Sequence, residues 1–154
     1  MPLSICLQNP EQYQDIPSLD DFTRWSNHTL DVAATHALPE EIEVTIRIVS
    51  QQESAELNQQ FRQKSGPTNI LSFHYHNDTT ITPYELGDLV ICAQVVQSEA
   101  RQQKKTTRDH WAHLTVHGIL HLLGYDHIEP PDADHMEQVE MIILKHFNVA
   151  NPYE

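Results

Sequence analysis

Basic residues are scarce in this sequence of 154 residues. Nine Lys and Arg stand against 22 Asp and Glu, which gives a formal net charge of -13 with the histidines neutral. Such a surplus of negative charge opposes non-specific binding to phosphate backbones and to anionic lipid. A nucleic-acid partner would therefore have to be bound at a local site.

Long apolar runs are also missing, since no stretch approaches the roughly 18 residues that a membrane span requires. The N-terminal "MPLSICLQNPEQ" has neither the basic region nor the continuous apolar region of a signal peptide. Cysteine is limited to Cys6 and Cys92, which form no C-x-x-C motif. Both lie in apolar, strand-like segments, so we expect reduced, buried thiols. These absences predict a cytoplasmic protein that does not act at a membrane.

The length suits one domain with a proper core, so residues 1–154 are expected to form a single domain. Apolar periodicity switches between strand and helix types without a regular βαβ repeat. We therefore predict an α+β fold, with helices packed on one mixed sheet of about four strands. The predicted strands are 3–8, 43–50, 69–75 and 86–93; the predicted helices are 18–38 with Ser18 as N-cap, 52–63, 94–105, 107–123 and 132–147; residues 76–85 are a predicted loop.

The stretch "HLTVHGILHLLGYDH" places four histidines in fifteen residues, from His113 to His127. His117 and His121 are four residues apart, so on a helix they lie on one face and can bind one ion. His113 is too far from His121 along a straight helix for all three to reach that ion. The third ligand should come from beyond a bend. Gly124 can adopt the left-handed conformation that ends a helix, and the returning chain would deliver His127.

Three neutral imidazoles leave a fourth position for water or substrate, as in catalytic zinc sites. A metal ion there could lower the pKa of bound water to about 7 and polarise an acyl or phosphoryl oxygen. Zinc fits this ligand set best, and imidazole also suits nickel and copper. A lone histidine is usually a surface or core residue, but three at this spacing around a glycine favour metal binding. His110 and His113 are expected to pack near the site rather than to bind the metal.

The spacing H-x-x-x-H-x-x-G-x-x-H is also that of metzincin metalloproteases. Those enzymes place glutamate directly after the first histidine, as the general base. Here that position is Gly118, so the usual route of peptide hydrolysis lacks its base. Asp126 could replace it in principle, although nothing in the sequence directs Asp126 toward the ion. A metalloprotease is therefore a minor alternative.

The segment "HGILHLLGYDH" closely resembles the bacterial YbeY family of metal-dependent endoribonucleases. "LNQQFRQKSGPTNILSF", "LGDLVIC" and "MEQVEMIIL" also resemble segments of that family, so the likeness extends from about residue 43 to residue 144. Departures are small: Ser65 and Gly66 replace a common acidic residue, and His74 stands where proline is frequent. The family's metal motif is matched by His117, Gly118, Leu120, His121, Leu122, Gly124, Tyr125, Asp126 and His127.

The resemblance implies that His117, His121 and His127 bind one divalent metal ion, zinc or else nickel, and that Arg62 is functional. It implies a single-strand-specific endoribonuclease that acts in maturation of the 3′ end of small-subunit rRNA and in ribosome quality control. The implied catalytic residues are Arg62, His117 and His121. The implied partners are single-stranded RNA, the small ribosomal subunit, and a ribosomal protein or a ribosome-associated GTPase.

Arginine suits this role because its planar fork of donors can bind a phosphate with two hydrogen bonds and stabilise charge on phosphoryl oxygens. The alternative for Arg62 is an exposed helix residue paired with a neighbouring acid. The distribution of basic residues also allows two interpretations. Six of the nine basic residues could form a basic rim for RNA, or "RQQKKTTR" could simply be a solvated helix end. These six residues are Arg62, Lys64, Arg101, Lys104, Lys105 and Arg108.

A second function remains open at the level of the sequence. The protein could be a ribosome-assembly factor that binds rRNA or a ribosomal protein without cutting and uses the metal mainly for its fold. Growth supported by a folded but catalytically dead variant would favour that function. Activity on an unstructured protein substrate would instead favour the metalloprotease.

Overall fold

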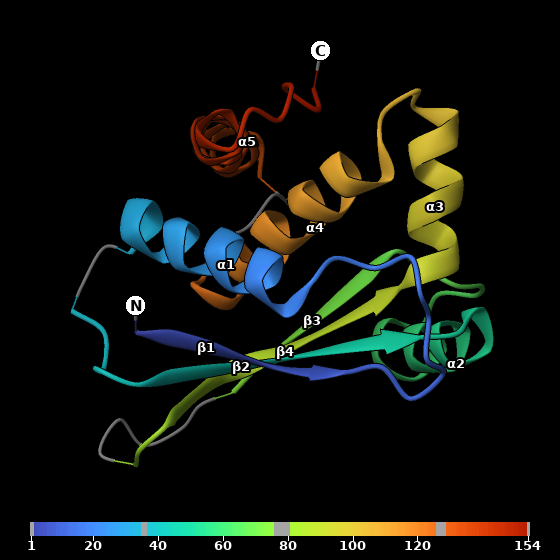
Figure 1. The fold of residues 1–154 in the computed structure, drawn as a ribbon, viewed down its shortest axis with the longest axis horizontal. Coiled ribbons are helices and arrows are strands. Elements are labelled where there is room, and N and C mark those ends of the chain that lie inside the picture. Colours follow the sequence, from blue (N-terminus) through green and yellow to red (C-terminus); the bar gives the residue numbers. More distant parts are fainter. Residues whose placement is uncertain (1, 35–36, 76–80, 126–128, 154) are drawn as a thin grey trace.

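The structure is a computed structural model that describes residues 2–34, 37–75, 81–125 and 129–153. None of the helices within these ranges combines the length and the apolar composition needed to cross a bilayer. Strands and helices follow one another irregularly along the chain (Figure 1). The described elements are β1 (Leu3–Gln8), α1 (Leu19–Ala33), β2 (Ile42–Val49), α2 (Gln51–Arg62), β3 (Ile70–His74), β4 (Tyr84–Cys92), α3 (Ala93–Gln102), α4 (Thr107–Leu122) and α5 (Pro130–His146).

The strands form one mixed sheet in the order β1-β2-β4-β3. β2 is parallel to both β1 and β4, whereas β3 runs antiparallel to β4 and lies at the end of the sheet. The predicted α+β class with a four-stranded mixed sheet is thus confirmed. β4 begins at Tyr84 rather than at Leu86, because Tyr84 pairs with Ile42 and extends the ladder with β2 into the predicted loop.

The core lies between the sheet and the helices α1 and α4. α5 packs on these two helices, on the side away from the sheet (Figure 1). Val44, Ile46 and Ile48 alternate along β2 and point into the core, where Trp25 and Trp111 are also buried. α4 contacts α1, α3, α5, β3 and β4, so most of its side chains are buried. The position of α4 is therefore fixed from several sides.

The opposite face of the sheet is covered differently. α2 packs there over a small apolar cluster that includes Leu71 and Cys92, with Leu57 and Phe73 against it. On β1, Leu3, Ile5 and Leu7 face the main core, so Cys6 faces the other side and is exposed. The predicted burial of Cys6 is wrong, because alternation along an edge strand does not reveal which face is covered. Cys92 is buried and free, as predicted.

The observed starts of the helices agree with the predicted starts more closely than the observed ends agree with the predicted ends. Ser18 caps α1, since its Oγ accepts a hydrogen bond from the Asp21 amide at 3.1 Å, as predicted. α1 ends at Ala33, five residues before the predicted end at 38, because Ala34 is extended with ψ 125°. Pro39 only sets the latest point at which the helix could end. α3 ends at Gln102 instead of Lys105, because Lys104 takes a left-handed backbone conformation with φ 56° that the sequence did not signal.

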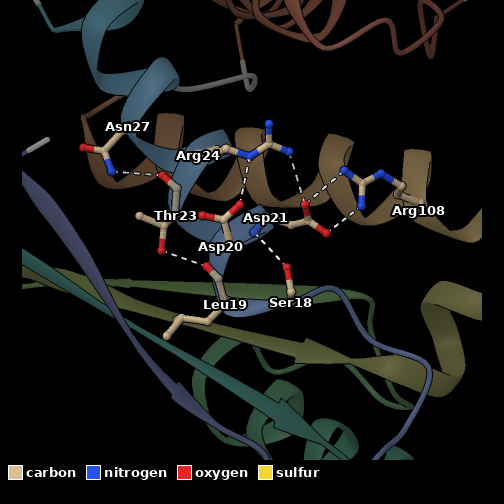
Figure 2. A network of polar contacts seen from close by, with 8 residues as sticks. All are labelled: Ser18, Leu19, Asp20, Asp21, Thr23, Arg24, Asn27 and Arg108. Carbon is tan, nitrogen blue, oxygen red and sulfur yellow. Dashed lines mark hydrogen bonds and ion pairs between the residues drawn. The ribbon is translucent and has the colours of Figure 1, made fainter.

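A network of charged side chains links the first turns of α1 and α4 (Figure 2). The Asp21 carboxylate accepts hydrogen bonds from both terminal nitrogens of Arg108, at 2.5 and 3.0 Å, and from Arg24 at 3.2 Å. The Arg108 guanidinium also lies 5.4 Å from the centre of the Trp25 ring. This network reinforces the packing of α1 against α4.

Candidate active site

His113, His117 and His121 follow one another at intervals of four residues along α4 and lie on one face of that helix. Each is half-buried, whereas most of the other side chains of α4 are fully buried. The other residues between positions 110 and 122 of α4 are buried, so these three side chains lie on the more exposed side of this part of the helix. The fold thus presents a row of imidazoles on a rigid element.

His117 and His121 are brought together as predicted. Their Nε2 atoms lie 3.0 Å apart, and their rings are nearly perpendicular, at 78°. Zinc–nitrogen distances of about 2.0 to 2.1 Å place two ligand nitrogens of a tetrahedral site about 3.3 Å apart, so this separation is compatible with two imidazoles that bind one ion. The donor set therefore fits a divalent metal such as zinc.

The predicted bend after α4 is present. Gly124 has φ +98°, and the amides of Gly124 and Tyr125 donate to the carbonyls of His121 and Leu120, each at 3.0 Å. This left-handed glycine ends the helix and turns the chain. The predicted third ligand, His127, lies outside the described residues, and so does Asp126. Their roles stay predictions.

Glu140 of α5 contacts two of the three histidines, His113 and His117. Its side chain is 0% exposed, and its Oε1 accepts a hydrogen bond from Nδ1 of His117. Its Oε2 lies 3.2 Å from Nε2 of His113 and also accepts from the hydroxyl of Tyr153. A carboxylate can only accept, so the proton of neutral His117 sits on Nδ1 and its Nε2 carries the lone pair. Glu140 thereby presents the nitrogen that faces His121 in the form that binds metal.

The charge state of Glu140 follows from its partners. Burial alone would raise the pKa of this carboxyl, but the hydrogen bonds from His113 and His117 outweigh burial and lower the pKa to about 2. Burial lowers the pKa of His113, with partial opposition from Glu140, and this favours the neutral ring. Burial and the hydrogen bond to Glu140 raise the pKa of Tyr153, so its hydroxyl remains a donor.

His113, His117 and Glu140 also form a cluster that could itself hold a metal ion, since their ligand atoms all lie within 4.8 Å of one another. His113 was expected near the metal rather than on it, and in the structure it contacts Glu140, which contacts His117. His110 lies further along α4, where its Nε2 is 2.8 Å from Oε1 of Glu99. His110 therefore belongs to the contact between α3 and α4.

Glu140 and Tyr153 were not identified from the sequence. Tyr153 gives no sequence signal, since it lies near the C-terminus outside any periodic segment. Glu140 does give one, because it is four residues after Met136 and three before Ile143, both buried, and so falls on the apolar face of its helix. An acid at such a position is almost never fully buried unless it is paired. That observation would have identified Glu140 as a residue with an internal partner.

Gly118 occupies the position where a metzincin has its glutamate. A Cβ atom at Gly118 would lie 2.8 Å from Cδ1 of Ile70 and 2.8 Å from Cδ2 of Leu89. Position 118 therefore faces the sheet, and glycine is what allows α4 to approach β3 and β4 this closely. A larger side chain here would displace the helix.

A groove with a volume of about 960 Å³ runs past the histidines. We call it the β3 groove. It is lined by Phe61, Arg62 and Lys64 at the end of α2, by residues 68–74 around β3, by His113, Leu114, His117, His121 and Leu122 of α4, and by Tyr153. The groove thus joins Arg62, which the sequence singled out, to the paired histidines.

Charge is distributed unevenly around this groove. None of the described residues that line it is acidic, although the chain has 22 acidic residues. A smaller hollow on the other face of the sheet is instead lined by Glu43, Glu85 and Asp88 among others. Arg62 is exposed and forms no ion pair with any acid in the ranges that the structure covers.

The basic rim considered from the sequence is only partly assembled. Arg62 and Lys64 line the β3 groove, whereas Arg108 is paired with Asp21 on α1. Arg101, Lys104 and Lys105, at the corner between α3 and α4, are not among the groove residues. Two of the six residues therefore contribute to the site.

Comparisons with known proteins identify the family of the chain. The family model described as Endoribonuclease YbeY matches residues 7–148. Endoribonuclease YbeY of Coxiella burnetii strain RSA 493 / Nine Mile phase I is 44% identical over 152 residues, which cover 99% of this chain and 99% of that protein. The same protein of Coxiella burnetii strain Dugway 5J108-111 matches to the same extent, with 44% identity over 99% of both chains.

A protein of Thermotoga maritima with a known solution structure shares the fold. The TM-score is 0.58 at 21% sequence identity, and the match covers 99% of this chain and 95% of that chain. This likeness concerns the fold, whereas the family model and the Coxiella sequences concern the sequence over nearly its whole length. The chain belongs to the YbeY endoribonuclease family.

Proposed function

We propose that this protein is a metal-dependent endoribonuclease that cleaves single-stranded RNA. The observation that carries the proposal is the β3 groove, in which two cationic side chains, Arg62 and Lys64, share one surface with the paired histidines. The absence of acidic residues among the described lining favours a polyanionic substrate at this place on an acidic protein. Family membership supports RNA as that substrate.

The metal would be held by His117, His121 and His127. The 3.0 Å separation of the first two Nε2 atoms supports their share of this set, and Glu140 keeps His117 in the required tautomer. Zinc suits three imidazoles best, and nickel is the second choice. When bound, such an ion supplies Lewis acidity toward a phosphoryl oxygen.

Arg62 would bind the phosphate that is cleaved. Its guanidinium is not engaged in an ion pair with the acids of the described residues, and it lies on the same groove as the histidines. Its fork of donors can hold two phosphoryl oxygens and stabilise the charge that develops on them. His117 and His121 would contribute by holding the metal ion beside this phosphate.

The metalloprotease alternative is disfavoured by the packing of Gly118 against Ile70 and Leu89. This position points into the sheet, so it offers no room for the general base that peptide hydrolysis by a metzincin uses. The alternative would need another base.

The physiological role in this proposal is maturation of the 3′ end of small-subunit rRNA and ribosome quality control in the cytoplasm. The small ribosomal subunit, with a ribosomal protein or a ribosome-associated GTPase, would be the partner. One core cluster includes residues from Leu3 to Leu144, and the groove draws on residues from α2 to Tyr153, so residues 1–154 would act as one catalytic domain.

Cleavage of a labelled single-stranded RNA by Arg62→Ala tests the assignment of Arg62. We expect the rate to fall by about 100-fold or more, as when one donor to a transition-state oxyanion is removed, with bound metal unchanged. Arg101→Ala is the matched control, because Arg101 is an exposed arginine near the end of α3, outside the groove. Loss of metal from Arg62→Ala, or equal rates in both variants, would contradict the assignment. Full support of growth by an inactive, folded variant would favour the assembly factor.

A further inference from the structure

Phe61 is an exposed aromatic residue in an unusual place. It is 54% exposed, whereas the other three phenylalanines, Phe22, Phe73 and Phe147, are buried or half-buried. Its ring lies 5.1 Å from that of Phe73, at an angle of 73°. The two rings therefore meet edge to face, and Phe61 keeps more than half of its surface exposed.

Phe61 and the histidines lie on opposite sides of the last strand of the sheet. Side chains alternate along β3, so Ile70 belongs to the core beneath α4, while Leu71 and Phe73 belong to the cluster beneath α2. The β3 groove includes residues of both sides. It therefore passes over β3, from the metal-binding face of α4 to the end of α2.

We propose that Phe61, held by Phe73, stacks on a nucleobase of single-stranded RNA bound in the β3 groove. Aromatic rings stack on any unpaired base, and the neighbouring Arg62 and Lys64 provide the positive charge that the backbone requires. Since Phe61 and the histidines flank β3 on different sides, the stacked base and the cleaved phosphate belong to different nucleotides. The inference rests on the proposed function, and it adds a subsite that selects unpaired strands, because bases in a duplex are already stacked.

The test is the Kd of the metal-loaded protein for a labelled, unstructured 2′-O-methyl oligoribonucleotide of about ten nucleotides, measured by fluorescence anisotropy. We expect Phe61→Leu to weaken binding about 10-fold and Phe61→Tyr to bind within about twofold of the wild type. Leucine keeps the apolar character of the side chain, so the difference between the two variants isolates stacking. Ile142→Ala is the control, because Ile142 is 60% exposed on α5 and does not line the groove.

A series of oligonucleotides with one abasic position places the subsite. When the abasic site falls where Phe61 stacks, binding by the wild type should weaken about 10-fold. The same abasic site should not change the Kd of Phe61→Leu. Equal Kd values for Phe61→Leu and the wild type, or abasic losses that add to the loss from the substitution, would overturn the subsite while leaving the proposed function intact. Failure of the wild type to bind RNA would overturn the proposed function itself, and the subsite with it.

Discussion

Glu140 decides which nitrogen of His117 is available to a metal. The buried carboxylate fixes the proton on Nδ1 and leaves Nε2 directed toward His121. The same carboxylate orders His113 and Tyr153, so one residue of α5 holds side chains from α4 and from the C-terminal segment. At the scale of single residues, the site is a pair of imidazoles on α4, one of which is oriented by a carboxylate on α5.

Glu140→Gln should therefore weaken metal binding. The amide keeps the size of the carboxylate but loses its charge and one acceptor, so His117 is no longer held in one tautomer. Loss of such a partner typically lowers metal affinity by 10- to 100-fold, roughly, and we expect an effect in this range. Competition with a chromophoric zinc chelator measures the affinity directly.

Two further variants serve as references for the zinc affinity of Glu140→Gln. Asp134→Asn removes an exposed acid of the same helix and should leave the zinc affinity unchanged. His121→Ala should lower the affinity more than Glu140→Gln does, because it removes a ligand. The reverse order, with Glu140 essential and His121 dispensable, would show that the metal sits in the cluster of His113, His117 and Glu140 instead.

The link between α1 and α4 should respond to pH. Hydrogen bonds from Arg108, and to a lesser degree from Arg24, lower the pKa of Asp21 in the folded protein. A lowered pKa means that the contribution is fully present above the ordinary aspartate pKa of about 3.9 and is lost as the pH falls through the folded-state value. Arg108 is half exposed, so we expect Asp21→Asn to lower the free energy of unfolding by only about 1 kcal/mol at pH 7.

Urea denaturation from pH 7 to pH 3 measures this difference. The gap between the wild type and Asp21→Asn should narrow as the solution becomes acidic. Asp20→Asn is the control, since the neighbouring Asp20 side chain is 81% exposed and is not bonded to α4. A gap that stays constant across the pH range would contradict a role for this ion pair.

At the scale of the elements, the sequence predicted what depends on local signals. Ser18 marks the start of α1 and Gly124 the end of α4, because the cap and the left-handed turn each depend on residues only a few positions away. The end of α1 and the covered face of β1 could not be predicted, because both depend on how distant segments pack. The hydroxyl of Tyr125, for example, donates to the carbonyl of Ala33 at 3.1 Å, a contact across 92 positions.

The candidate metal site shows the same difference between local and long-range signals. The pair His117 and His121 follows from helical spacing alone. Glu140 joins this pair through the packing of α5 on α4, and Arg62 reaches the groove because α2 ends beside β3. Helical spacing could not provide either contact, although the buried position of Glu140 in an apolar helix face was a usable signal.

The whole molecule is acidic, with a formal net charge of -13, whereas the described lining of the β3 groove contains Arg62 and Lys64 and no acid. RNA binding should therefore depend on salt far less than it does for a basic RNA-binding protein. With Arg62 and Lys64 as the main phosphate contacts, we expect log K to fall against log salt with a slope of about -1.4, that is, about -0.7 for each contact.

Titrations with the uncleaved oligonucleotide at several salt concentrations measure this slope. Lys64→Ala should reduce the slope by about 0.7, and Lys104→Ala, in the exposed corner after α3, should leave it unchanged. A much steeper slope in the wild type, or an equal effect of both variants, would place the phosphate contacts outside the groove.

The central claim is that the paired histidines hold a metal ion with which this protein cuts RNA. The most direct test is cleavage of a labelled single-stranded RNA by wild-type protein and by His121→Ala, purified identically, with bound metal quantified in both. We predict that the variant loses both the metal and the cleavage. Equal cleavage by the two preparations would show that the activity is not that of this protein, and would contradict the claim.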